Sequence, residues 1–271
     1  MTEPASTSAH PMEFNPTVSH SARIWNYWLG GKDNFEADRE IGDQFQQLFP
    51  EIVDIARGSR GFLSRAVTYL AGEAGIRQFL DIGTGLPTAD NTHEVAQRTA
   101  PEARIVYVDN DPMVLAHARA LLVGSREGKT EYIDANLHDP ETILAAASNA
   151  TLDFDQPVAL MLMNILGHIP DLDEARAIVS RLVAALPSGS YLVVADGTNV
   201  VRGEAFQAAI DVWNASGSLP YHLRSTDELS GFFAGLELIE PGLISCPLWR
   251  PDTDPELLRE IDEFGGVGRK P

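Results

Sequence analysis

The sequence of 271 residues is poor in cysteine and in positive charge. Its one cysteine, Cys246, allows no disulfide within the chain, and we expect a reducing compartment, the cytoplasm. The 39 acidic residues against 20 basic ones give a formal net charge of −19. Because such a surface repels the phosphate backbone of nucleic acids, we expect no nucleic-acid partner.

Long apolar runs are also missing. No stretch reaches the roughly 18 consecutive apolar residues of a transmembrane helix, and the first residues have neither the basic start nor the apolar run of a signal peptide. The segment SARIWNYWLGGKDNFEADRE, residues 21–40, is rich in aromatic residues, but Asn26, Gly30 and Lys32 interrupt it. We therefore expect no membrane anchor and no membrane partner.

Two common kinds of site have no signature in this sequence. There is no Gly-Lys-Ser/Thr loop that would hold a nucleotide phosphate. No group of His, Cys and Asp residues has the spacing of metal ligands, so we expect no metal.

The order of patterns predicts an α/β domain. Five short apolar runs, which we interpret as strands, alternate with helical patterns, so a mostly parallel sheet with helices on both faces is expected. Two tail segments, 235–244 and 264–271, are expected to pair at the sheet edge, and Ser225 with Glu228 predicts a helix capping box. The five runs cover residues 77–83, 104–112, 130–136, 157–164 and 190–197.

Ahead of these runs lies an N-terminal extension. Residues 1–18 are rich in Pro, Ser and Thr and are expected to be poorly ordered. Residues 19–72 predict three helices, the first capped by Ser19 or Ser21. Residues 73–271 would be the main domain, forming one structural unit with the extension.

The strongest chemical signal is FLDIGTGLPT, residues 79–88. An apolar strand ends at Asp81, and Gly83, Thr84 and Gly85 form a tight turn in which the backbone can approach a ligand. The next strand ends at Asp109, where a carboxylate can accept both hydroxyls of a ribose. Read alone, the glycines could be only a strand-to-helix turn.

The pattern favours one nucleotide ligand over another. A dinucleotide fingerprint requires a small residue where Thr88 stands, and no Arg or Lys lies nearby in the sequence to meet a pyrophosphate. Asp81 would repel phosphate but suits a ligand with an ammonium group. These features point to S-adenosylmethionine as the cofactor.

Three segments in order, LDIGTGLPT, VYVDNDPMVLAHARALL and YIDAN, resemble the first three motifs of the class I S-adenosylmethionine-dependent methyltransferases. The opening ARIWNYWLGGKDNFEADRE and the ending GGVGRKP resemble the actinobacterial S-adenosyl methyltransferase family, formerly classed as a domain of unknown function. The resemblance implies the Rossmann-like class I fold, a seven-stranded sheet with an antiparallel last strand. It implies no particular acceptor.

The resemblance also implies roles for single residues. Gly83 and Gly85 match the glycines of the first motif, and Asp81 matches its acidic residue. Asp109 matches the ribose-binding acid, and Asn110 beside it would contact ribose or adenine.

Further along the chain, Asp134 matches the acid that accepts from the adenine amino group, with the Ala135 N–H beside it. Asn164 ends the fourth strand, where related enzymes place a residue beside the methionine end and the methyl group. The loop departs from the common motif at residues 86–87, because Leu-Pro replaces the third glycine.

The opening stretch is interpreted as a lid over the cofactor. Arg23, Asn26, Tyr27 and Gly30 share one helix face, which would point inward, while the other face packs on the domain. The alternative is that Arg23 pairs with Asp38 or Glu36 and that Tyr27 only packs. The candidates for contacts with the acceptor or for the lid are Arg23, Asn26, Tyr27, Lys32 and Asn34.

The catalytic candidates are Tyr27 and His168. His168 follows the fourth strand at the carboxyl edge of the sheet, where it could act as a general base near pH 7. The alternative is a loop histidine without a chemical role.

The sequence thus predicts a methyltransferase that uses S-adenosylmethionine and acts on a small molecule. One alternative is a non-catalytic sensor or auxiliary protein that binds S-adenosylmethionine or S-adenosylhomocysteine. Another is a nicotinamide-dependent oxidoreductase. Exposed apolar residues in the opening stretch would permit a homodimer.

Overall fold

The helices and strands follow the expected order along the chain. The structure, a computed structural model, describes residues 15–111, 113–116, 124–216 and 219–271. Most of the helix expected near residues 114–122, and residues 1–14 of the expected disordered N-terminus, lie outside this part. The main elements are α1 (Ser21–Trp28), α2 (Glu36–Leu48), α3 (Ile52–Gly72), β1 (Gln78–Ile82), α4 (Thr92–Thr99), β2 (Arg104–Asp109), β3 (Lys129–Asp134), α6 (Pro140–Ala150), β4 (Ala159–Met163), α7 (Leu172–Ala185), β5 (Tyr191–Gly197), α8 (Glu204–Ala215), α9 (Thr226–Ser230), β6 (Glu237–Leu238), β7 (Ile244–Ser245) and β8 (Glu263–Arg269).

The strands form one mixed sheet in the order β3-β2-β1-β4-β5-β8-β6, with β7 beside β8. Strands β1 to β5 pair in parallel, and β8 runs antiparallel to β5, β6 and β7. The class I fold with an antiparallel last strand is therefore confirmed, with eight strands in place of the expected seven. The tail segments pair as predicted, but β8 lies inside the sheet and β6 forms its edge.

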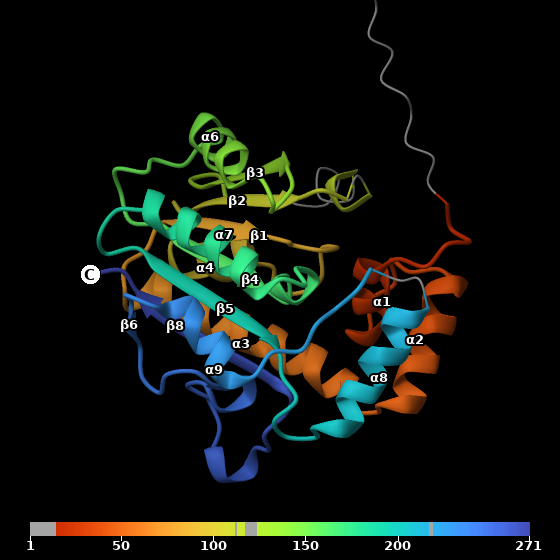
Figure 1. Cartoon of the computed structure of the whole chain (residues 1–271). Coiled ribbons are helices and arrows are strands. Elements are labelled where there is room, and N and C mark those ends of the chain that lie inside the picture. The colour runs from red at the N-terminus through yellow and green to blue at the C-terminus, as the bar shows by residue number, and fades with distance from the viewer. Residues whose placement is uncertain (1–14, 112, 117–123, 217–218) are drawn as a thin grey trace, which may run out of the picture.

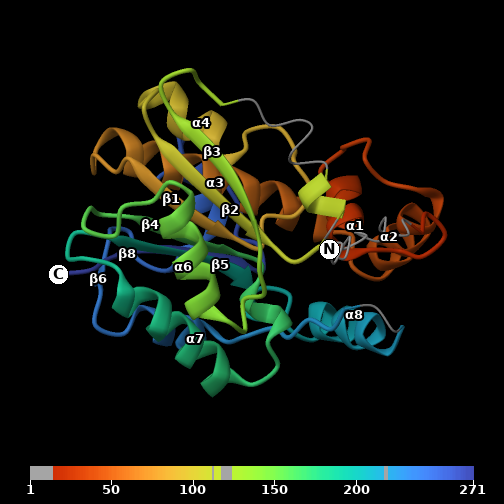
Figure 2. The same ribbon diagram turned by 90° about the horizontal axis from the view of Figure 1, so that it is seen from above.

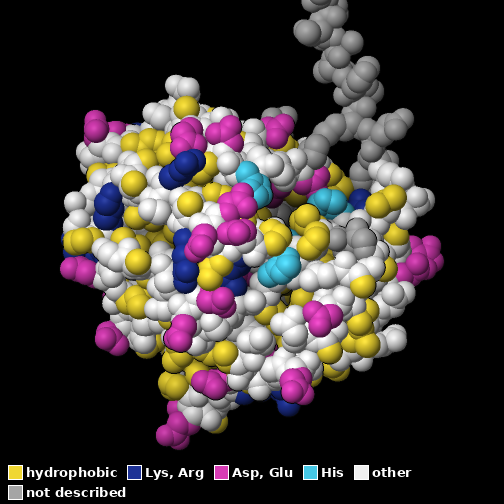
Figure 3. Space-filling model, viewed as in Figure 1, with side chains coloured by type: hydrophobic (Ala, Val, Ile, Leu, Met, Phe, Trp, Pro, Cys, Tyr) yellow, Lys and Arg dark blue, Asp and Glu magenta, His cyan; other side chains and the backbone are white. Residues whose placement is uncertain are grey.

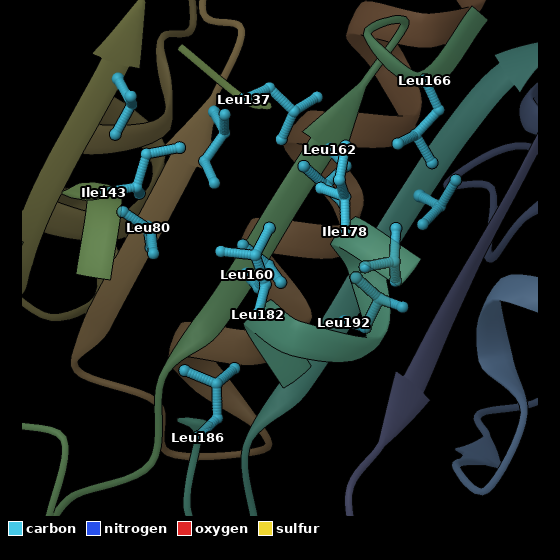
Figure 4. Packing of buried hydrophobic residues seen from close by; sticks show 14 of the residues in the cluster. Leu80, Leu137, Ile143, Leu160, Leu162, Leu166, Ile178, Leu182, Leu186 and Leu192 are labelled. Atoms are coloured by element: carbon cyan, nitrogen blue, oxygen red, sulfur yellow. The ribbon is translucent and has the colours of Figure 1, made fainter. Parts of the chain in front are cut away.

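Alternate residues of each strand pack on opposite faces of the sheet. Leu80 and Leu160 belong to the core under α6 and α7, which Figure 4 shows closely packed. Phe79 and Ile105 belong to the second core, under α3 and α4. Both faces of the parallel strands are covered, which explains why these strands are continuous apolar runs.

A third core lies beyond the carboxyl ends of the strands. It joins α1, α2 and α8, which we call the cap, and Figures 1 and 2 show these three helices together at one end of the molecule. Helix α3 contributes to two cores, because Ile52 and Ile55 pack in the cap while Phe62 and Leu63 pack under the sheet. Helix α8 belongs to the sequence range expected for the main domain, but it packs with the N-terminal extension.

The sequence predicted the residues that cap α1 and α9. The N-cap of α1 is His20, whose Nδ1 accepts a hydrogen bond from Ala22 N (3.3 Å), so the prediction of a serine cap was wrong. The capping box of Ser225 and Glu228 at α9 is confirmed. No helix in the described part of the chain is long and apolar enough to cross a membrane.

Candidate functional site

A cavity of about 410 Å³ lies between the carboxyl ends of β1, β2 and β4 and the cap. This is the size and place of a small-molecule site in an open α/β sheet. In Figure 3, apolar and histidine side chains border a hollow on the face shown. The sheet half of the cavity is lined by polar groups such as Asp81 and Asp109, and the cap half by rings such as Trp25 and Trp213.

The glycine loop after β1 has a backbone that favours glycine. Gly83 has φ +77° and Gly85 has φ +62°, both in the left-handed region. A Cβ on Gly83 would lie 2.6 Å from Ile165, so this position is closed to side chains on steric grounds as well. Both glycines and Thr84 line the cavity, where the backbone is open to a ligand.

Asp109 ties the end of β2 to this loop. One carboxylate oxygen accepts a hydrogen bond from Gly85 N (3.0 Å), and the other accepts one from Asp111 N (2.9 Å). Burial raises the pKa of Asp109, and the two backbone donors oppose that rise. Asp109 and the exposed Asn110 both line the cavity.

Asp81 is a buried carboxyl group in the wall of the same cavity. It is 5% exposed and accepts a hydrogen bond from Thr92 Oγ1 (2.6 Å). Burial raises the pKa of Asp81 from 3.8 to about 6, although the Thr92 hydrogen bond and the charge of Arg60 lower it. An ammonium group of a ligand would favour the charged form of this carboxyl.

Arg60 of α3 adds a positive charge to the cavity wall near Asp81. This residue was not predicted from the sequence. Its side chain lines the cavity, and the charge of Asp81 partly offsets the fall that burial causes in its pKa. Among the described residues Arg60 makes no hydrogen bond or ion pair. A guanidinium in a cavity wall that makes no direct ion pair can bind a carboxylate group of a ligand.

Asn164, at the end of β4, belongs to a chain of hydrogen bonds that the sequence did not reveal. It has φ +54°, a conformation uncommon outside glycine. Its Oδ1 accepts from Ser59 Oγ (2.7 Å), and its Nδ2 donates to Glu263 Oε1 (2.7 Å). All three residues line the cavity, and they come from α3, β4 and β8.

The predicted adenine contacts lie next to the cavity. Asp134 is exposed and pairs in register with Asp109 at the same sheet edge, and Ala135 N donates to Asp109 O (3.3 Å). Neither Asp134 nor Ala135 lines the cavity. Their proposed contact with adenine stays a prediction.

The expected inward face of the opening helix points elsewhere. Arg23 is buried in an ion pair with Asp38 (2.8 Å), the alternative that the sequence had left open. The Asn26 side chain accepts from Asp33 N (3.1 Å) and from Asn34 Nδ2 (3.0 Å). These bonds stabilise the segment between α1 and α2, and they leave Arg23, Asn26 and Asn34 outside the cavity lining.

Tyr27 and Lys32 are likewise outside that lining. The Tyr27 hydroxyl donates to Asp43 (2.6 Å), and Lys32 is exposed. The opening helix instead presents Trp25 and Trp28 to the cavity. The helix does form a wall of the cavity, but with the face opposite to the one expected to point inward.

His168 does line the cavity. Its Nδ1 donates to Pro220 O (2.8 Å), which leaves Nε2 as the acceptor nitrogen. Burial lowers the pKa of His168, so the ring is neutral near pH 7 and can accept a proton. The structure therefore separates the two catalytic candidates, because Tyr27 is held by Asp43 away from the cavity.

The described ranges contain no group of three or more His, Cys, Asp or Glu side chains placed to hold an ion. The free thiol of Cys246 is buried.

Known proteins resemble this chain in sequence and in fold. The model of a family described as S-adenosyl methyltransferase matches residues 7–271. A DUF574 family protein from Streptomyces avermitilis is 45% identical, with a TM-score of 0.89 over 94% of this chain and 98% of its own. A presumed methyltransferase from Thermobifida fusca is 40% identical, with a TM-score of 0.85 over 94% and 96%.

More distant similarity shows the fold alone. An O-methyltransferase family protein from Burkholderia thailandensis is 20% identical, with a TM-score of 0.52 over 76% of this chain and 55% of its own. A search of the curated proteins finds no match. The match of the family model over nearly the whole length, together with the two close structural relatives, shows that this chain belongs to the S-adenosyl methyltransferase family.

Proposed function

We propose that this protein binds S-adenosylmethionine in the cavity and transfers its methyl group to a small molecule. The observation that carries the proposal is the pair of opposite charges, Asp81 and Arg60, beside the glycine loop. This pair is complementary to the ammonium and carboxylate of an amino acid. A dinucleotide would instead place phosphates near the buried Asp81 carboxyl.

The other cofactor contacts follow from the order of the strands. Asp109 at the end of β2 would accept from the ribose hydroxyls, because its carboxylate is held at the cavity edge by Gly85 N. Asp134, one strand further in register, would meet the adenine end. Gly83, Thr84 and Asn164 would lie along the methionine part.

When bound, S-adenosylmethionine supplies a methyl group on a positively charged sulfur; the acceptor forms a bond to the methyl carbon as the sulfur–carbon bond breaks. The protein must orient the acceptor and exclude water. The cap provides the enclosing wall with Trp25 and Trp28. Where the acceptor loses a proton, Nε2 of His168 is a base in reach of the cavity.

A small acceptor is favoured over a macromolecule for two reasons. The cavity is covered by the cap, and the net charge of −19 opposes binding of nucleic acid. The cytoplasm is the compartment in which the cofactor and the free thiol would both be expected.

The test of cofactor binding is calorimetry with S-adenosylmethionine, S-adenosylhomocysteine and NAD. The first two should bind and NAD should not. Asp109→Ala should weaken binding by about 2–4 kcal/mol, because it removes charge-assisted hydrogen bonds to the ribose. Binding of NAD, or a dissociation constant within threefold of wild type in a folded Asp109→Ala variant, would refute the assignment.

The test of the carboxylate contact is Arg60→Met, with Arg57→Met as the matched control. Arg57 is exposed on the same helix, one turn away. Only the Arg60 variant should lose affinity for the cofactor, by tenfold or more. Formation of S-adenosylhomocysteine in the presence of a cell extract then separates an enzyme from a sensor, since a sensor would bind the cofactor without turnover.

A further inference from the structure

The part of the cavity that α1, α2 and α8 line, which we call the chamber, has apolar walls. Apart from Ser21, the lining residues of these fully described helices are apolar, and none is charged. The indole N–H of Trp28 donates to Gly42 O (3.3 Å), and that of Trp213 donates to Leu219 O (2.9 Å). Because backbone oxygens already hold these two N–H groups, the rings present carbon surfaces and π faces to a ligand.

The described residues provide no counter-ion for a charged ligand group in the chamber. The charged side chains of the cavity lining lie on α3 and at or just beyond the ends of the strands: Arg60, Asp81, Asp109, Asp111 and Glu263. Of these, Glu263 is 0% exposed and its carboxyl accepts from Asn164 Nδ2 (2.7 Å), so it is not open to a ligand. Since a charge moved from water into apolar surroundings without a partner costs free energy, the chamber favours an uncharged body.

His168 brings one hydrogen-bond acceptor to the edge of the chamber. Its ring packs edge-on against that of Tyr221, with the centroids 5.1 Å apart, and Tyr221 packs against the core of the cap. Nδ1 donates to Pro220 O (2.8 Å), so Nε2 carries the lone pair, and no described residue bonds it. Burial lowers the pKa of His168, so the ring is neutral near pH 7 and Nε2 can accept a hydrogen bond from a ligand.

Residues 219–224 hold the chamber wall and this acceptor together. Backbone oxygens at the start of the segment accept from Trp213 and from His168. At its end the buried Arg224 donates to two backbone oxygens of residues 166–169 (2.7 and 2.6 Å). The position of Nε2 relative to the apolar wall is therefore fixed, and so is the place where a ligand must carry its donor.

We propose that the methyl acceptor is an uncharged, flat apolar molecule with a hydroxyl group that donates to Nε2 of His168. This inference rests on the proposed function and specifies the substrate class of the same site. On methyl transfer the hydroxyl oxygen bonds to the methyl carbon as the carbon–sulfur bond breaks, and the electron pair of that bond stays on sulfur. The hydroxyl proton passes to Nε2, so the products are a neutral methyl ether and S-adenosylhomocysteine.

Other groups fit this position less well. A carboxylate has no proton to donate to Nε2 and brings an unpaired charge into the chamber. A protonated amine can donate, but its charge also lacks a counter-ion there. A ring nitrogen that only accepts hydrogen bonds leaves Nε2 without a partner.

Four ligands with the same two-ring body separate these cases: 2-naphthol, quinoline, 2-naphthoate and 2-naphthylmethylamine. We would titrate each into the wild-type protein by calorimetry at neutral pH, both alone and with saturating S-adenosylhomocysteine. 2-Naphthol should bind about fivefold or more tightly than quinoline, because only 2-naphthol donates to Nε2. The two charged ligands should bind more weakly than quinoline. Equal affinities of 2-naphthol and quinoline, preference for a charged ligand, or no binding of 2-naphthol at millimolar concentration would overturn the proposal.

His168→Phe isolates the acceptor atom, because it keeps a ring against Tyr221 and removes Nε2. The variant should bind 2-naphthol no more tightly than quinoline, while its affinity for S-adenosylhomocysteine stays within threefold of wild type. The control His138→Phe changes an exposed histidine outside the cavity lining and should keep the preference for 2-naphthol. Retention of that preference by a folded His168→Phe variant would sink the assignment, and the wild-type series decides the matter if the variant does not fold.

The two proposals fail separately in this design. Loss of S-adenosylhomocysteine binding with a preserved preference for 2-naphthol would refute only the cofactor assignment. Normal binding of S-adenosylhomocysteine without that preference would refute only the acceptor class.

Discussion

The substitution Asp81→Asn should make the protein more stable and less able to bind its cofactor. Asp81 is buried, and its carboxyl accepts a hydrogen bond from Thr92 Oγ1. An asparagine has nearly the same shape and keeps an oxygen for that bond. The substitution therefore removes the ionisable group with little change in packing.

The size of the effect follows from the pKa of Asp81. A rise from 3.8 to about 6 on folding means that the ionised group costs the folded state about 3 kcal/mol at neutral pH. The substitution introduces an amide N–H group that has no hydrogen-bond acceptor provided for it. Burying this group costs about 1 kcal/mol and reduces the gain in stability by that amount. The net gain of about 2 kcal/mol corresponds to an increase in melting temperature of about 4–8 °C for a chain of this length.

The pH dependence identifies the cause. Because the folded-state pKa of Asp81 lies above the unfolded value, the cost is absent at low pH, grows between pH 3.8 and about pH 6, and is complete above pH 6. The stability difference between variant and wild type should therefore shrink to less than about 1 kcal/mol at pH 4.

The assay is thermal unfolding of both proteins at pH 4 and pH 7.5, with and without S-adenosylmethionine. The ligand should raise the melting temperature of wild type more than that of the variant, because its ammonium pairs with the Asp81 carboxylate. A variant that is less stable than wild type at pH 7.5, or a difference that does not change with pH, would refute the reasoning.

Three further predictions concern other parts of the site. Arg23→Ala should lower the free energy of unfolding by about 3–5 kcal/mol in chemical denaturation, because it breaks a buried ion pair. Tyr27→Phe should lower it by less than about 1 kcal/mol, because it removes one exposed hydrogen bond. Equal effects would contradict the packing described for α1. Gly83→Ala should abolish cofactor binding in calorimetry because of its positive φ and the close side chain, while Gly72→Ala, at the end of α3, should bind normally. His168→Gln should leave cofactor affinity unchanged and lower turnover about a hundredfold or more, with wild-type turnover falling as pH drops through the pKa of His168; unchanged turnover would exclude it as the base.

The edge of the cavity formed by the strand ends could be predicted because its residues follow local patterns. Asp81, Gly83 and Asp109 each stand at the end of an apolar strand, and parallel strands end at one edge of a sheet. The bond from Gly85 N to Asp109 joins two such ends across 24 residues of chain. The antiparallel last strand was expected from the resemblance to the class I methyltransferases, and the two-residue strand β7 is too short to show a periodic pattern.

The rest of the site is created by tertiary packing. Ser59 and Arg60 lie in α3, and no sequence pattern distinguishes them from the other polar residues of that helix. Glu263 came from the far end of the chain, and nothing in its neighbourhood connects it with Asn164, 99 residues earlier. No local pattern marks a residue whose partner is supplied by another element.

The prediction of which face of α1 points toward the cavity was wrong for a related reason. This helix has eight residues and is covered on both sides, since Arg23 is buried against Asp38 while Trp28 is buried against Phe45 and Trp213. Periodicity distinguishes buried from exposed faces. It does not distinguish a face that meets another helix from one that meets a cavity.

The single helix α3 fixes the distance between the two halves of the site. Its 21 residues span about 30 Å without a proline, and one end is embedded in the cap while the other lies under the sheet. An α-helix resists stretching, so the aromatic wall of the cap and the carboxyl ends of the strands are held at a constant distance. Under the proposed function, changes in α1, α2 or α8 would alter which acceptor fits, while the distance between acceptor and cofactor would be preserved. A change of pitch or a kink in α3 would shift that spacing for every acceptor alike.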